Sequence, residues 1–179
     1  MARKIDGKVV EAPAVAAAPP PPEFPPAEPG LTAEGLSGLT RSFWAKSGKR
    51  SPTDWLSVPQ HLMDAADVAG RLFDSYLSEH HRALLASVWG GDQAKARTSL
   101  VFLAGVHDVG KASLPFCCQH GPLADFVRAH GVRVPQRRDV PDRGNLPHGL
   151  ASRFALVNAI AQGGGDRKRA SKWAAVIGV

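Results

Sequence analysis

Cysteine is scarce in this sequence, which has only two in 179 residues. They are the neighbours Cys117 and Cys118. Adjacent cysteines rarely bridge each other, so the sequence gives no sign of the disulfide framework of a small secreted protein. We expect the two thiols to lie in a core.

The sequence also lacks an apolar run long enough to cross a membrane. Its first 20 residues loosely imitate a signal peptide, but Glu11 and Pro13 interrupt their apolar part. These two absences predict a cytoplasmic protein with no membrane partner. The formal net charge is +6, which fits a partner that carries phosphates, although many ordinary proteins are as basic.

Strong strand signals and internal repeats are missing too, and the sequence therefore predicts an all-α fold. Residues 1–35 are rich in Pro and Ala and cannot form a core, so we expect a disordered tail followed by one domain over residues 36–179. Apolar residues at helical spacing and helix-breaking residues between them predict helices over residues 58–77, 79–89, 93–109, 114–119, 123–130, 148–161 and 166–177.

The most informative stretch is LVFLAGVHDVGKAS, residues 100–113. It opens as an apolar run without a polar face, which predicts a helix buried on all sides. His107 and Asp108 follow, near the negative end of the helix dipole, where a carboxylate is disfavoured unless a cation lies close. A divalent metal ion would supply that cation, and Gly110 could end the helix in a left-handed conformation. The simpler interpretation pairs Asp108 with Lys111.

Two further histidines fall near inward helix faces. His61 lies on the same helical face as Ala65, Val68 and Leu72, and His148 lies in the first turn of its helix, just after Pro147. A lone inward histidine is usually a satisfied core residue. Together with the His-Asp doublet, however, these side chains form a plausible set of metal ligands on three separate helices.

Four segments in order resemble one family. FWAKS, WLSVPQHLMDAADVAGRLF, LAGVHDVGKASLPF and LPHGLA are similar to the HD nuclease domain of the CRISPR-associated helicase-nuclease of type I systems. The resemblance covers residues from about 36 to the end. It implies a helical bundle of the HD-domain type that binds one or two divalent transition ions: manganese, iron, nickel or cobalt. It also implies hydrolysis of phosphodiester bonds in single-stranded DNA by a metal-activated water, during antiviral defence.

The resemblance also implies roles for particular residues. The metal ligands would be His61, His107, Asp108 and His148, with Asp108 as the bridging ligand. Asp108 and Lys111 would act in catalysis, because a lysine beside the metals can stabilise charge on the transferred phosphoryl group. The implied partners are single-stranded DNA and the RNA-guided surveillance complex, which exposes a displaced DNA strand.

The sequence departs from the family in its last segment, KWAAVIGV, residues 172–179. The family continues with a paired histidine and a later aspartate ligand, whereas this sequence ends at Val179 without them. We therefore expect a C-terminally incomplete domain, with the helicase on a separate chain. Two alternatives stay open. One is an HD phosphohydrolase of nucleotides or other phosphomonoesters, and the other is an inactive fragment that acts only as a binding module.

Basic residues lie in two segments after residue 130. Arg137 and Arg138 belong to an irregular stretch, and Arg167 and Lys168 open the last predicted helix. Such charge runs are normally solvated. Since the resemblance implies a DNA substrate, we predict that these four side chains bind the nucleic acid.

Overall fold

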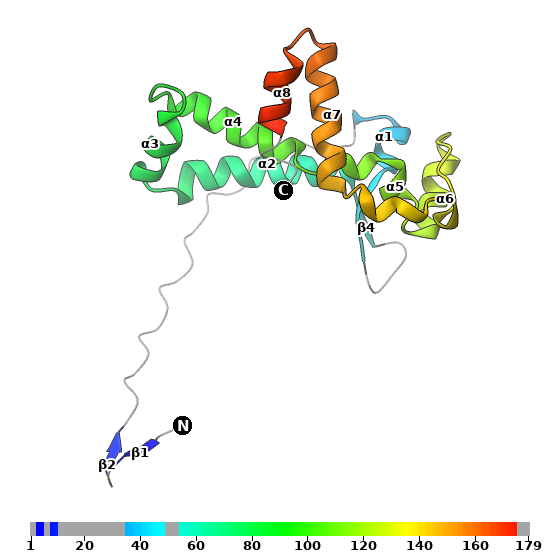
Figure 1. Ribbon diagram of the computed structural model, residues 1–179. Coiled ribbons are helices and arrows are strands. Elements are labelled where there is room, and N and C mark those ends of the chain that lie inside the picture. Colours follow the sequence, from blue (N-terminus) through cyan, green and yellow to red (C-terminus); the bar gives the residue numbers. More distant parts are fainter. Residues whose placement is uncertain (1–2, 6–7, 11–34, 49–53, 175–179) are drawn as a thin grey trace.

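The computed structural model describes residues 3–5, 8–10, 35–48 and 54–174. Helices make up most of this part of the chain, which confirms the all-α helical bundle (Figure 1). In chain order the elements are β1 (Arg3–Ile5), β2 (Lys8–Val10), α1 (Gly38–Ser42), β3 (Trp44–Ser47), β4 (Trp55–Ser57), α2 (Val58–Arg71), the π-helix η2 (Leu72–Tyr76), α3 (Glu79–Ser87), α4 (Gln93–Val106), the 3-10 helix η3 (Val109–Ala112), α5 (Leu114–Cys117), α6 (Gly121–Ala129), the 3-10 helices η4 (Arg137–Asp139) and η5 (Pro141–Asn145), α7 (His148–Gln162) and α8 (Arg167–Ala174).

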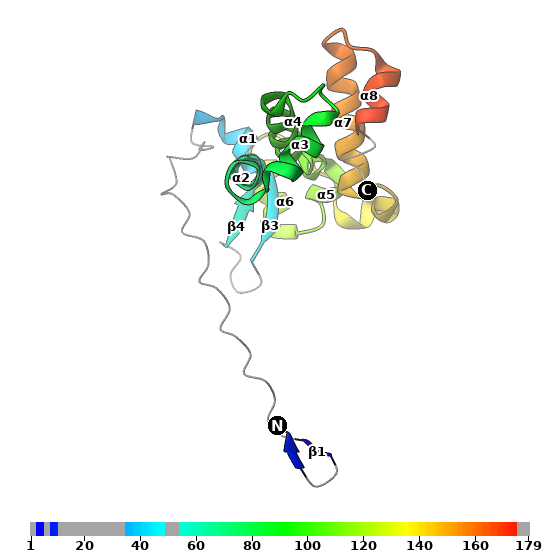
Figure 2. The ribbon, with the colours of Figure 1, turned by 90° about the vertical axis from the view of Figure 1, so that its left-hand side faces the viewer.

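Helices α2 and α4 lie side by side and form the base of the bundle (Figures 1 and 2). The Ser57 side chain caps α2 by accepting a hydrogen bond from the Gln60 amide, and Asp92 caps α4 in the same way at the Lys95 amide. Between α3 and α4 the chain turns back through Gly90 and Gly91, whose φ angles are +67° and +90°. Such angles strain any residue with a side chain, so these glycines fix the turn.

Helix α7 rises from the base, and α8 folds back beside it (Figure 1). Asp166 caps α8, because its carboxylate accepts a hydrogen bond from the Arg169 amide at 2.6 Å. The first turn of α7 packs against η3, which immediately follows the His107-Asp108 doublet. This contact brings the third predicted ligand segment to the other two.

The described residues include four short strands, which the sequence did not predict. They form two antiparallel pairs, β1 with β2 and β3 with β4. Strand β3 has two buried residues followed by two exposed ones, so it lacks the alternation that reveals a strand in a sequence. The pair β1–β2 falls within the predicted tail, and residues 11–34 of that tail lie outside the described part of the chain.

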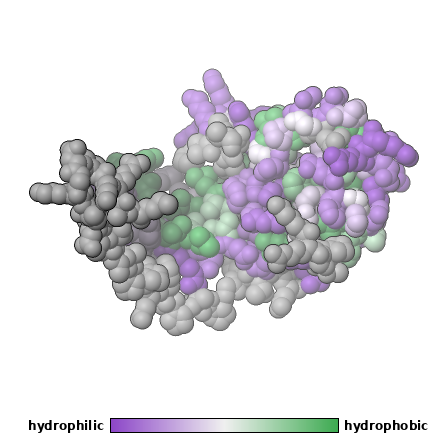
Figure 3. Space-filling model, turned by 90° about the horizontal axis from the view of Figure 1, so that it is seen from below, coloured by the Kyte–Doolittle hydropathy of each residue, from purple (hydrophilic) through white to green (hydrophobic). Residues whose placement is uncertain are grey.

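The prediction that α4 is buried on all sides is wrong in the described structure. Phe102 leaves 52% of its surface exposed, and Val68 on α2 and Leu72 in η2 are also exposed. On the face seen in Figure 3, hydrophobic residues in green lie beside hydrophilic residues in purple. The apolar run of α4 therefore includes exposed residues as well as those that pack against α2.

Within the described residues, the core consists of three small clusters rather than one. The largest packs α5 and α6 against Trp44 and contains Cys117 and Cys118, which are free thiols as predicted. Burial raises the pKa of Cys117 to about 11, and the neighbouring Cys118 adds to this shift. The other clusters join α7 to α8 and η2 to α3 and α4. No helix in the described ranges is both long and apolar enough to cross a membrane.

Candidate metal centre

Helix α2 presents His61 at the end of its first turn. The β3–β4 pair holds this end of the helix in place, because Trp44 pairs with Ser57 and the Val58 amide donates to the Phe43 carbonyl. The His61 side chain is 12% exposed, and its Nε2 lies 2.9 Å from Oδ2 of Asp108. The predicted inward orientation of His61 is therefore correct.

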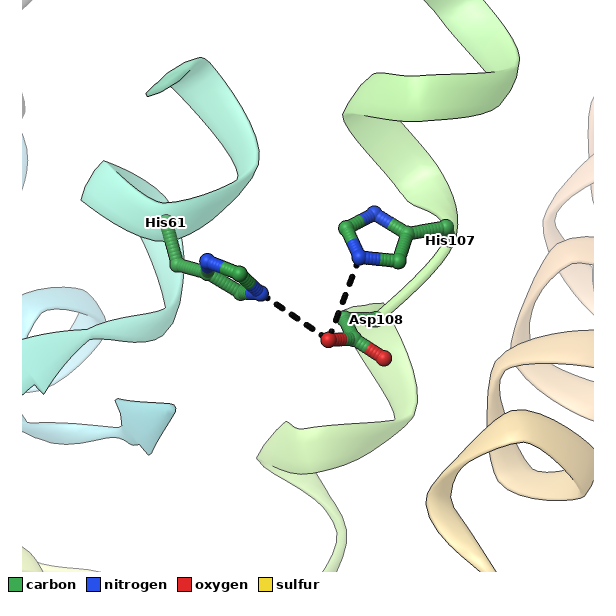
Figure 4. Close-up of side chains that lie close together, drawn as sticks. All are labelled: His61, His107 and Asp108. Atoms are coloured by element: carbon green, nitrogen blue, oxygen red, sulfur yellow. Dashed lines mark hydrogen bonds and ion pairs between the residues drawn. The ribbon is translucent and has the colours of Figure 1, made fainter. Parts of the chain in front are cut away.

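His107 and Asp108 occupy the junction between α4 and η3. Helix α4 ends at Val106, and Asp108 adopts φ −114° and ψ 15°, so the chain turns between the two helices. As a result, the two neighbouring side chains converge: His107 Nε2 lies 3.2 Å from Asp108 Oδ2. Figure 4 shows both imidazoles directed at this carboxylate.

Three nitrogen atoms surround one oxygen of the buried Asp108 carboxylate. Besides the two imidazoles, Lys111 Nζ lies 2.6 Å from Oδ2. Burial by itself raises the pKa of Asp108, but hydrogen bonds from Lys111 and His61, with the positive charge of Lys111, hold it below its ordinary value. The carboxylate is thus ionised at neutral pH. Its contribution to stability is present above the unfolded-state pKa of about 3.9 and is lost as the pH falls through the folded-state pKa.

The orientation of His107 suits a metal ligand. Its Nδ1 lies 2.7 Å from the Ala104 carbonyl oxygen, which can only accept, so Nδ1 carries the hydrogen. In the neutral ring Nε2 then has a lone pair that faces a carboxylate oxygen, an arrangement that a cation between them would stabilise. A carbonyl partner on the second ring nitrogen is typical of metal-bound histidines.

The donor atoms of His61, His107 and Asp108 all lie within 4.8 Å of one another. Two imidazole nitrogens and one carboxylate oxygen are ligands that divalent transition ions accept. These residues therefore fit such an ion, and the cluster could hold one.

His148 approaches the same carboxylate from the opposite side. Its Nε2 lies 3.3 Å from Oδ1 of Asp108, and its side chain is 45% exposed. The ring also meets Phe116 edge-on, with centroids 5.8 Å apart. The two oxygens of Asp108 thus face different imidazoles. This arrangement is suited to a carboxylate that bridges two ions.

The residues that bring His148 into place, Gly110 and Ser152, were not predicted from the sequence to do so. Gly110 was expected to end a helix with a left-handed backbone, but its φ is not positive, and its role lies elsewhere. A β-carbon at Gly110 would overlap the His148 carbonyl oxygen and the Ser152 amide nitrogen. Ser152 lies four residues after His148, on the same helix face, and this spacing was the signal available in the sequence.

The four predicted DNA-binding residues do not form one cluster. Arg137 and Arg138 lie in η4, in the segment between α6 and α7, whereas Arg167 and Lys168 begin α8, beyond the far end of α7 (Figure 1). All four side chains are exposed. They lie on two separate parts of the surface.

The family model described as "Cas3, HD domain" matches residues 44–179. The chain belongs to this family. The matched range includes all four candidate ligands and Lys111. The Cas3 HD domain family is one of CRISPR-associated nucleases, which confirms the resemblance found in the sequence.

One curated relative of this Cas3 HD domain is the "CRISPR-associated nuclease/helicase Cas3" of Streptococcus thermophilus. It is 36% identical over 83 residues, which make up 44% of this chain and 9% of the relative. The chain therefore spans only a small part of the length of that relative. No solved structure matches the chain.

Proposed function

We propose that this chain is a metal-dependent nuclease domain that cleaves single-stranded DNA in CRISPR antiviral defence. The observation that supports this most strongly is the buried Asp108 carboxylate, with Oδ2 facing His61 and His107 and Oδ1 facing His148. When bound there, one or two ions of manganese, iron, nickel or cobalt supply Lewis acidity for the attack of water on a phosphodiester.

The residues of the site have different proposed roles. His61, His107 and His148 are the proposed neutral ligands, and Asp108 the ionised, bridging one. Lys111 is 10% exposed and holds its ammonium group beside the carboxylate, so it can stabilise negative charge on the phosphoryl oxygens of a bound strand. Asp108 and Lys111 are thus the proposed catalytic residues.

The proposed partners follow from the family. An RNA-guided surveillance complex would present the displaced strand of its R-loop to the site in the cytoplasm. A helicase is a further proposed partner, on a separate chain, whereas the name of the S. thermophilus relative places nuclease and helicase in one protein.

We expect the purified chain to cleave an end-labelled single-stranded oligonucleotide in Mn²⁺ and to stop when EDTA is added. Metal content of the same preparation, measured by mass spectrometry, gives the number of ions. Two comparison substrates are tested beside it: a duplex of the same sequence, and a set of free deoxynucleotides. Turnover of the nucleotides with an intact oligonucleotide would instead establish a phosphohydrolase of phosphomonoesters. Stable protein that binds no metal and cleaves nothing would contradict the proposed activity.

We also propose that Arg137, Arg138, Arg167 and Lys168 bind DNA phosphates. Each lost contact to single-stranded DNA reduces the slope of log affinity against log salt by about 0.7. The variants R137Q/R138Q and R167Q/K168Q should therefore each lower the slope by up to about 1.4, measured by fluorescence anisotropy. K95Q, which removes an exposed lysine paired with Asp92, is the control. A slope unchanged in both double variants would exclude these four residues from the DNA interface.

A further inference from the structure

A fully buried serine joins two of the segments that carry the candidate ligands. Ser152 on α7 is 0% exposed. Its Oγ accepts a hydrogen bond from the Gly110 amide at 2.8 Å and donates one to the His148 carbonyl oxygen at 2.9 Å. One hydroxyl group therefore forms hydrogen bonds both to η3, at Gly110, and to the backbone of the candidate ligand His148.

The two segments, η3 and the first turn of α7, are in contact with no side chain between their backbones. Gly110 has no β-carbon, so the η3 backbone lies directly against the first turn of α7. The beginning of α7 has no side-chain cap of its own, because its N-cap residue is Pro147. The Ser152 hydroxyl is therefore the polar group that fixes this turn at its distance from η3.

That distance decides where His148 lies. Asp108 is two residues before Gly110, and His148 is the first residue of α7. The 3.3 Å approach of His148 Nε2 to Asp108 Oδ1 exists only while η3 and α7 keep this separation. An alanine would fill nearly the same space as Ser152 but would leave the buried Gly110 amide without its acceptor.

We infer that Ser152 is a positioning residue, which holds His148 at the second oxygen of Asp108. This inference rests on the proposed function, because the position of His148 affects metal binding only if His148 is a ligand. Ser152 itself does not reach the carboxylate. It acts through the backbone of the helix that carries His148.

The test is a double-mutant cycle on Mn²⁺ affinity, measured by isothermal titration calorimetry. S152A should weaken binding about 10-fold or more, as loss of an outer-sphere partner does. S152A/H148A should be no weaker than H148A alone, because Ser152 acts only through His148. Additive losses would overturn the inference. The control is S42A, which removes another buried hydroxyl, whose hydrogen bond to the Leu39 carbonyl stays within α1, and should leave affinity unchanged.

The same variants, studied by NMR without metal, separate this inference from the proposed function. S152A should increase exchange of the Gly110 amide and weaken the contact between the His148 and Phe116 rings, whereas S42A should change neither. If the wild-type protein binds no Mn²⁺, the proposed function fails, and the NMR signals of Gly110 and His148 test the positioning role without metal. Unaltered His148 signals in S152A would then overturn that role. If S152A does not fold, S152C, with similar volume and a weak acceptor, replaces it in both experiments.

Discussion

Replacing Asp108 with asparagine should abolish metal binding and DNA cleavage together. The substitution keeps the size of the side chain but removes the charge on which His61, His107 and Lys111 converge. It also replaces one of the two carboxylate oxygens with an amide nitrogen, which cannot bind a metal ion, so that either His148 or the pair His61 and His107 faces a group that is no ligand. We expect Mn²⁺ affinity to fall by more than the roughly 10–100-fold that loss of an outer-sphere partner costs. Calorimetry and the oligonucleotide assay measure the two losses.

The same variant should also be less stable, for a separate reason. The Lys111 side chain is only 10% exposed, and without Asp108 its ammonium group would stay buried with no carboxylate beside it. Leaving one partner of a buried pair unpaired costs about 3–5 kcal/mol. D108N/K111M, which removes both charges, should therefore recover most of the thermal stability and still bind no metal. That combination would separate the loss of a ligand from a loss of folding.

An exposed carboxylate provides the matched control for Asp108. Asp74 pairs with Arg97 at 2.7 Å, and both side chains are nearly half exposed. D74N should cost at most about 1 kcal/mol and leave Mn²⁺ affinity unchanged, because a surface ion pair contributes little. If D108N instead binds Mn²⁺ as tightly as wild type, the site assigned to His61, His107, Asp108 and His148 is wrong.

The candidate ligands could be singled out in the sequence because their signals are local. Adjacent imidazole and carboxylate side chains after an apolar run are unusual in themselves, and His61 falls on a helix with a clear apolar period. Helix starts were equally readable: Ser57, Asp92 and Asp166 each cap a helix that begins within a residue or two of its predicted start. These features depend on neighbours in the sequence rather than on packing.

What could not be predicted depends on contacts between distant segments. The apolar run of α4 predicts burial, but which faces become covered depends on the helices that pack there, and Phe102 stays exposed. Strand β3 is too short, and its burial too irregular, to show a period of two. Gly110 was assigned to a helix end because its sequence neighbours allow that role. Only the approach of α7, some forty residues later, reveals that a β-carbon has no space there.

Gly110→Ala should therefore be among the most damaging single substitutions in the domain. The added β-carbon would overlap two backbone atoms of α7, at His148 and Ser152, and would lie 2.8 Å from the Ala151 carbonyl carbon. Backbone atoms of a helix cannot move aside as a flexible side chain can, so η3 and α7 must separate. Overpacking typically costs about 1–3 kcal/mol, and the lost acceptor of the buried Gly110 amide adds about 1–3 kcal/mol.

Gly105→Ala is the control that makes this result specific. Gly105 lies in α4, five residues earlier, and a β-carbon there would meet only Ala66 Cβ, at an ordinary distance of 3.5 Å. Alanine favours a helix over glycine by about 1 kcal/mol, so G105A should melt at or above the wild-type temperature. G110A should melt several degrees lower and bind Mn²⁺ more weakly, because His148 moves away from Asp108. Equal melting temperatures for wild type and G110A would mean that η3 and α7 are not in direct backbone contact.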